Sequence, residues 1–447
     1  MKKILSILMA VTIVVLFILT WYCSHKTEQH FTAQIAAINQ ASPELINVEL
    51  INYQRKLFTA NAATAVSIRG EEKLSFNHQI RHFVWGVKII TTLAPDSALA
   101  KEIVTQVPLD QLQLITDFSL LGASKSRFIL PQLTFQDDSV NLEITGFSIG
   151  WDLSADLTMG NFVCLLDNLQ LQQVDQGELN LANLRISTQM TDLQDSPLGN
   201  GELQLEKLRL IRSGRPAIEF QNIQYRGQTN LNQGLFSGTA ELDFARLLLA
   251  EETLSDGRLK LTLAGIDADL LRSIQQTGEQ LQLKALNQQN SPLELQLQLL
   301  GLYTELLNSG ATLTLEELSL STDNGKINGN GVLSLLKEST SESSFFSLDN
   351  ITANFQLEID RDAFVTGYRL LNNLQSAEGK YQNPAVLAEQ AEQIAGGLVQ
   401  KGIFVRQDED TYHLDFSWAE GQGGFDYAQP PDNPETETGP LSTKTGP

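Results

Sequence analysis

The sequence is poor in cysteine, which limits the chemistry that can be expected of it. Its 447 residues include two cysteines, Cys23 and Cys164, and their wide separation is typical of isolated small apolar side chains, not of a disulfide framework. A phosphate loop, a dinucleotide-binding fingerprint and a Cys-x-x-Cys motif are also absent. We therefore assign no catalytic, cofactor-binding or metal-binding residues, and we do not expect an enzyme.

Positive charge is scarce as well. The chain has 31 Lys and Arg against 53 Asp and Glu, which gives a formal net charge of -22. Such a charge opposes binding to nucleic acid and to anionic lipid headgroups, so any contact with lipid should be apolar. A hydrophobic content of 42% nevertheless predicts a folded protein with one or more sizeable cores.

One long uncharged run stands at the N-terminus, from Ile4 to Cys23. At about 1.5 Å per residue, a helix of this length spans a hydrocarbon core of about 30 Å. Lys2 and Lys3 precede the run, and the positive-inside rule places them in the cytoplasm with the remaining chain translocated. We predict a cytoplasmic segment at 1–3 and a transmembrane anchor at 4–23, through which the protein contacts the membrane.

Cleavage of this run as a signal peptide is the competing interpretation. The segment from Thr20 to Ser24 offers no small-x-small site, and the bulky Tyr22 argues against lipoprotein processing at Cys23. Beyond the anchor, apolar residues at helical spacing predict a helical stalk at 24–42, ended by Ser42-Pro43. A β-rich domain at 43–428 and a disordered tail at 429–447 complete the predicted organisation.

Alternation of apolar and polar residues dominates the domain, as in Leu293 to Leu299, and predicts half-buried strands. A finer pattern, apolar-x-apolar-x-x-apolar-x-apolar, recurs in nine copies. The copies are FILPQLTF (from Phe128), LEITGFSI (Leu142), CLLDNLQL (Cys164), LNLANLRI (Leu179), LQLEKLRL (Leu203), IEFQNIQY (Ile218), LTLAGIDA (Leu261), LTLEELSL (Leu313) and FSLDNITA (Phe346). Copies that start 14 or 15 residues apart, such as those from Leu203 and Ile218, predict stacked hairpins.

The alternation slips by one residue in the middle of each copy, which a β-bulge would produce. The slip residue is Asn or Gly in six copies, and both types tolerate the left-handed conformation (Gly146, Asn168, Asn183, Asn222, Gly265 and Asn350). Gln132, Lys207 and Glu317 are the exceptions. Coincidence in a Leu-rich sequence is the alternative, although five copies are polar or glycine at all four x positions and composition predicts about one or two.

The fold class that follows is mainly β: a long, curved, bulged antiparallel sheet built from hairpin repeats. Three short helices are expected to cover it, at Asp267–Gln276, at Asp362–Leu374 and from Pro384 to Leu398, before a closing hairpin around 408–410. An excess of one-sided strands over helices leaves apolar surface to be covered. A bound apolar molecule, closure into a barrel and folding over as a sandwich would each satisfy it.

Several segments together resemble the YdgA-like family of bacterial envelope proteins. They are Tyr53–Phe58 (YQRKLF), the block from Gly301 to Leu335 that includes LTLEELSLSTDNGKINGNGVLSL, Leu398–Ile403 (LVQKGI) and Tyr412. The resemblance covers most of the chain, and it implies a β-rich domain in the periplasm, anchored by a single pass in the inner membrane. It implies no reaction, because the family is largely uncharacterised. More distantly, the repeated strands are similar to the AsmA-like envelope proteins associated with lipid movement.

The chain departs from the YdgA-like pattern at two places. Lys56 stands where the family usually has glycine, and His82-Phe83-Val84 replaces a His-Gly-Pro segment. His78 and His82 would share one face of a helix and could hold a metal there, but their aromatic surroundings predict a strand, where about 13 Å would separate them. Asp137-Asp138 and Asp408-Glu409-Asp410 could serve glycosidase chemistry, although both read better as solvated turns.

Three function classes follow from these patterns. The first is a noncatalytic envelope protein that binds a lipid or another apolar ligand on its curved sheet. The second is a structural or assembly factor of the envelope, acting through contacts with other proteins or as a homo-oligomer. An enzyme comes third, since it would need convergent polar groups in a pocket.

Overall fold

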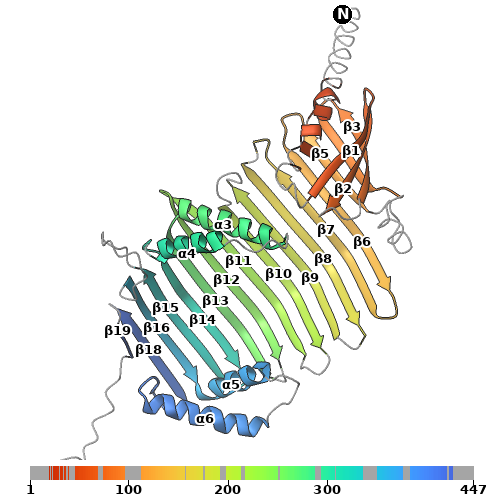
Figure 1. The fold of residues 1–447 in the computed structure, drawn as a ribbon. Coiled ribbons are helices and arrows are strands. Elements are labelled where there is room, and N and C mark those ends of the chain that lie inside the picture. Colours follow the sequence, from red (N-terminus) through yellow and green to blue (C-terminus); the bar gives the residue numbers. More distant parts are fainter. Residues whose placement is uncertain are drawn as a thin grey trace, which may run out of the picture.

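A computed structural model describes the chain between residues 20 and 425, with gaps, the longest at 96–111 and 336–349. One antiparallel sheet of 19 strands dominates it (Figure 1). The strands are β1 (Ile46–Arg55), β2 (Thr59–Ile68), β3 (Leu74–Phe83), β4 (Gly86–Leu93), β5 (Gln113–Ser119), β6 (Ser124–Gln136), β7 (Val140–Leu153), β8 (Met159–Gln173), β9 (Gly177–Thr191), β10 (Leu198–Arg212), β11 (Ile218–Asn232), β12 (Leu235–Leu249), β13 (Glu252–Asp267), β14 (Thr312–Thr322), β15 (Gly325–Leu335), β16 (Ile351–Asp360), β17 (Val405–Arg406), β18 (Thr411–Ala419) and β19 (Gln422–Phe425).

Each strand from β1 to β16 pairs with the next in the chain, so this part of the sheet is a simple meander. β18 then pairs with β16, and β17 and β19 pair with β18. The predicted long antiparallel sheet, its hairpins and the closing hairpin are confirmed. Among the described residues the sheet neither closes into a barrel nor folds into a sandwich, so both alternatives are wrong.

The slip in alternation is real, but the bulge that we expected at most copies is not its cause. Asn183 on β9 lies opposite Glu206 on β10, and the pairs on either side, Leu184–Leu205 and Ala182–Lys207, keep the same register. A β-bulge would add one residue to a single strand and shift that register. Both strands slip at the same level instead, which returns the apolar residues of both to one face.

This shared level crosses eight strands, from β6 to β13, as one row of residues, which we call the slip row. The row is Pro131, Gly146, Asp167, Asn183, Glu206, Asn222, Ala245 and Asp256. Every second member has a positive φ: 65° at Gly146, 51° at Asn183, 53° at Asn222 and 50° at Asp256. Register shifts do occur beyond the row, between β12 and β13 beside Gly265 and in the pairings of β14.

Helices lie at both ends of the strands (Figure 1). They are α3 (Ala268–Leu286), α4 (Leu293–Leu307), α5 (Arg361–Gln375) and α6 (Pro384–Gln400). The three predicted helices are confirmed as α3, α5 and α6, but the strand predicted at Leu293–Leu299 is wrong, because this segment begins α4. Its Leu, Gln and Glu residues are good helix formers and include no β-branched residue, and propensity here outweighs a short run of alternation.

The predicted N-terminal anchor lies almost entirely outside the described residues, as does the predicted tail at 429–447. Within the described part of the chain, no helix is long and apolar enough to cross a membrane. The described residues between 24 and 39 are helical, as predicted for the stalk, but they pack along β1. Phe31 contacts Tyr53 and His78, with ring centroids 6.0 and 5.2 Å apart.

The central strands present two different faces. One face carries rows of ion pairs between neighbouring strands, such as Arg258 Nε to Asp243 Oδ1 at 2.8 Å and Arg226 Nη1 to Glu241 Oε2 at 3.3 Å. Leu242 lies between Glu241 and Asp243 in sequence, so its side chain points to the other, apolar face.

Candidate functional site

The apolar face of β9–β14 contains a groove, and the sequence explains its shape. Two adjacent rows of paired residues cross the strands here. The first row is Thr188, Gly201, Gly227, Ala240 and Leu261, and the second is Met190, Gly199, Thr229, Gly238, Leu263 and Leu313. Glycine, alanine or threonine occupies the middle strands in both rows, and every outer position except Thr188 is leucine or methionine, so the missing side-chain volume leaves a hollow.

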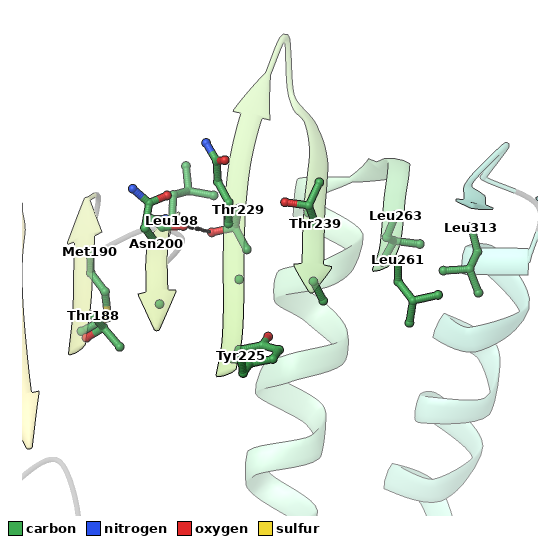
Figure 2. A pocket seen from close by; sticks show the side chains of 16 residues that line it. Thr188, Met190, Leu198, Asn200, Tyr225, Thr229, Thr239, Leu261, Leu263 and Leu313 are labelled. Atoms are coloured by element: carbon green, nitrogen blue, oxygen red, sulfur yellow. Dashed lines mark hydrogen bonds between the residues drawn. The ribbon is translucent and has the colours of Figure 1, made fainter. Parts of the chain in front are cut away.

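Large side chains form the walls of this groove (Figure 2). Met190 and Leu198 lie on one side, and Leu261, Leu263 and Leu313 lie on the other. The cavity has a volume of about 490 Å³, within the range of about 300–1,000 Å³ that is usual for small-ligand sites.

The groove offers apolar contact and few hydrogen bonds. No charged residue lines it among the described residues. The Thr229 hydroxyl accepts from the Gly199 N–H at 2.9 Å and is thereby occupied, whereas the buried Thr188 Oγ1 has no hydrogen-bond partner within the described chain. Tyr225 is 41% exposed and Leu242 37% exposed beside the groove. Asn200, Gln228 and Thr239 also line the groove, so an apolar chain that ends in a polar group would suit it.

The opposite end of the same apolar face is covered. Leu370 on α5 packs with Leu249 of β12 and Leu254 of β13 in one buried cluster. Arg369 holds the helix in place, with its Nη2 donating to Glu252 Oε2 at 3.0 Å. The groove is therefore the open part of a face that is a closed core elsewhere.

His78 and His82 both lie on β3, as predicted. They are four residues apart, so their side chains face the same side of the strand. His78 is held between two hydroxyls, with Nε2 2.8 Å from Thr64 Oγ1 and Nδ1 2.9 Å from Thr91 Oγ1. Burial lowers the pKa of His78 to about 4. Burial and the nearby Arg55 also lower the pKa of His82, whose two ring nitrogens have no partner among the described residues.

His82 and the hydroxyl of Tyr53 on β1 are both buried. His82 is 3% exposed, and the equally unpaired Tyr53 hydroxyl has its pKa raised to about 12 by burial and by Glu28. No group of three His, Cys, Asp or Glu side chains gathers in the part of the chain that the structure describes.

Both acidic pairs lie in turns, as predicted. The Asp137 carboxylate accepts from Ser139 N at 2.6 Å and from Val140 N at 2.7 Å, and these bonds lower its pKa. Asp408 accepts from Asp410 N at 2.8 Å and has its pKa lowered by that bond. Carboxylates that close their own turns are poorly placed for acid–base chemistry.

One motif escaped our assignment from the sequence. Gly146–Gly150 reads GFSIG and matches the Gly-x-Ser-x-Gly pattern of serine hydrolases. In those enzymes the serine sits on a sharp turn from a strand to a helix. Here Ser148 lies inside β7 and pairs with Ile129 and Leu165 on the neighbouring strands, and Gly146 belongs to the slip row. The context that would make Ser148 a nucleophile is missing.

The residues that line the groove were not predicted from the sequence either. Its signal is the coincidence of glycines at matching levels: Gly201 pairs with Gly227 on the neighbouring strand, and Gly199 and Gly238 lie on either side of Thr229, two strands apart. That signal can be read only after the strand register is known.

Comparison with known protein families identifies a bacterial family of unknown function. The sequence model of DUF945, described as bacterial protein of unknown function, matches residues 1–426. The chain therefore belongs to this family. No curated protein and no solved structure matches it.

Proposed function

We propose that this DUF945 protein is a noncatalytic protein of the bacterial envelope that binds an apolar chain, such as a lipid acyl chain, in the groove of its sheet. The observation that carries the proposal is the pair of rows in which small residues on β10–β12 are flanked by large apolar ones. An apolar hollow of this kind gains free energy when a ligand displaces water from it, at about 25 cal/mol per Å² of apolar surface buried.

A location in the periplasm, on an inner-membrane anchor at 4–23, is part of the same proposal. It is supported by the uncharged run from Ile4, by Lys2 and Lys3 before it, and by the resemblance to YdgA-like and AsmA-like envelope proteins. With a net charge of -22, the affinity should depend on acyl-chain length and little on salt.

Photolabelling tests the groove. The full chain is reconstituted into vesicles that contain a phospholipid with a photoactivatable acyl chain, and labelled peptides are mapped after illumination. We expect labels on β10–β13 in addition to labels on residues 4–23. Labels on 4–23 alone would contradict binding in the groove.

A glycine substitution supplies the specific variant. A Cβ at Gly201 would lie 3.7 Å from Thr188 Cγ2, an ordinary contact, so Gly201→Phe can fill the groove without a backbone clash. Gly150→Phe is the matched control, since a Cβ there meets only Ser126 O at 3.6 Å, on β7 and away from the groove. Gly201→Phe should lose the labels on β10–β13, and Gly150→Phe should keep them.

A structural or assembly factor is the second candidate. It is favoured by the apolar side chains that α4 leaves exposed, with Leu297 58%, Leu300 62% and Tyr303 47% exposed. Strand addition at β1 is less supported, because the Asn39 side chain already bonds the Val48 N–H at 2.7 Å and the Val48 carbonyl at 2.8 Å. Wild-type chain that takes no label on the sheet, yet forms defined oligomers, would favour this candidate.

A further inference from the structure

Three neighbouring hairpin turns at one end of β1–β6 carry exposed apolar side chains. Phe58 follows β1, Trp85 follows β3, and Leu120 and Leu121 follow β5. We call these four residues the tip cluster. Their exposures are 49% for Phe58, 71% for Trp85, 49% for Leu120 and 86% for Leu121.

Backbone hydrogen bonds join the three turns into one surface. His82 N donates to Phe58 O at 2.8 Å, and Leu120 N donates to Trp85 O at 2.9 Å. The Trp85 ring stacks on Phe83 with centroids 5.4 Å apart and an interplanar angle of 11°. The tip cluster is therefore a contiguous apolar edge, and not four unrelated exposed side chains.

The N-terminal helical residues run along β1 and fix where the preceding chain enters. Going backwards along the helix, Asn39 contacts Val48, Glu28 pairs with Arg55 at 3.0 Å, and the Ser24 hydroxyl donates to Lys56 O at 3.3 Å. This order places residue 24 beside the β1–β2 turn. The chain before Thr20, which is uncharged back to Ile4, therefore joins the domain at the end that bears the tip cluster.

The three turns of the tip cluster lack acidic side chains, and Asp156 lies in the next turn on the same edge, between β7 and β8. The turns at 56–58, 84–85 and 120–123 contain no Asp or Glu, although the whole chain carries a net charge of -22, and their one charged residue is Lys56. At the opposite end of the strands, Asp137 and Asp138 form the β6–β7 turn. Trp, Phe and Leu beside Lys are residue types that partition into the membrane interface.

We propose that the tip cluster inserts into the interface of the same lipid bilayer that holds the apolar run, so that the domain docks directly on the membrane. The groove opens near the strand ends on the same long edge of the sheet, since Leu198 begins β10 and Leu263 lies near the end of β13 (Figure 1). Docking would hold that edge toward lipid. The proposal goes beyond ligand binding and does not require the groove to be occupied.

Fluorescence of the full chain in phosphatidylcholine vesicles tests the docking. The Trp85 signal is the wild-type spectrum minus that of Trp85→Phe, which removes the contributions of Trp21, Trp151 and Trp418. We expect the Trp85 signal to lose most of its intensity in vesicles brominated near the headgroup, and to resist quenching by acrylamide. The signal of Trp418, obtained in the same way from Trp418→Phe, should not respond to bromine, because β18 lies at the other end of the sheet.

Equal Trp85 signals in brominated and plain vesicles, with strong quenching by acrylamide, would overturn the proposal. A second measurement places a nitroxide at Leu121→Cys or at Val174→Cys, in a chain with Cys23 and Cys164 replaced. Val174 is the matched control because it is 59% exposed and lies in the β8–β9 turn at the opposite end. We expect the label at 121 to collide more with oxygen and the label at 174 more with a water-soluble nickel complex.

A label at 121 that is shielded from both reagents would also overturn the proposal, and would identify a second copy of the chain as the partner. The photolabelling of the groove is read separately on β10–β13. Failure of docking and failure of ligand binding are therefore distinguishable.

Discussion

Asn183 and Glu206 face each other on β9 and β10 at the level where the apolar alternation slips, and the Asn183 amide donates to the Glu206 carboxylate. Asn183 has φ 51°, in the left-handed region that Asn tolerates. A side chain that bonds across the strands thus accompanies a backbone conformation that most residues avoid. Together they keep Leu181 and Leu184 on one face of β9.

Replacing Asn183 with Val should destabilise the sheet by about 1–3 kcal/mol, because a β-branched residue is strained at positive φ. Asn183→Gly should cost less, since glycine adopts this conformation freely. Asn180→Val, on the same strand outside the slip row, is the control and should be nearly neutral. Urea unfolding of the four proteins measures the differences, and equal losses for the two Val variants would contradict the role of φ.

A charge at Leu205 should be far more damaging than one at its neighbour. Leu205 is 7% exposed on the apolar face, whereas Gln204 is exposed on the charged face. Leu205→Asp buries an unpaired carboxylate and should cost more than about 3 kcal/mol. Gln204→Asp should change stability by about 0.5 kcal/mol or less. Thermal unfolding gives the comparison, and similar losses would show that the two faces were misassigned.

Repetition made much of this fold predictable. Eight of the nine pattern copies begin in β6–β11, β13 and β14, because one apolar and one polar face impose a period of two on each strand. The level of the slip on neighbouring strands could not be read from a single copy, since it depends on register. Leu293–Leu299 shows the other limit, where alternation and helix propensity conflict within seven residues and tertiary context decides.

The groove was less predictable than the sheet. Gly201 and Gly227 are 26 positions apart in the sequence, and only the β10–β11 register places them side by side. The shortage of covering helices predicted apolar surface on the sheet, but it left open whether a ligand, a barrel or a sandwich would cover that surface.

Acidification should destabilise the N-terminal strands through His78. Its pKa in the folded protein is about 4, against about 6.5 in an unfolded chain. Between these values the unfolded state binds the proton and the folded state does not, so stability falls as the pH drops through this window, by at most about 1.4 kcal/mol per pH unit. His78→Asn should show a shallower pH dependence from 6.5 to 4 when urea unfolding is compared with wild type.

The control for this pH dependence is His413→Asn. His413 lies on β18, with Nε2 3.0 Å from Asp415 Oδ2, and is remote from β3. An identical pH dependence in wild type and His78→Asn would show that the His78 ring is not what resists protonation.

Helix α5 closes one end of the apolar face, and its removal from that face should be costly. Leu370 is 6% exposed against Leu249 and Leu254, whereas the adjacent Leu371 is 53% exposed. Leu370→Ala leaves a cavity and should cost about 2–5 kcal/mol. Leu371→Ala, the matched control, removes the same atoms from water-exposed surface and should cost less than about 1 kcal/mol.

The same pair of variants separates a core from a binding surface. If the covered end and the open groove belong to one continuous apolar face, Leu370→Ala should lower stability without changing the photolabelling of β10–β13. If α5 instead moved to expose more of the face to lipid, the variant would gain labels on β12 and β13 around Leu249 and Leu254. Unfolding by urea and peptide mapping of the labelled protein, carried out on the same preparations, distinguish these results.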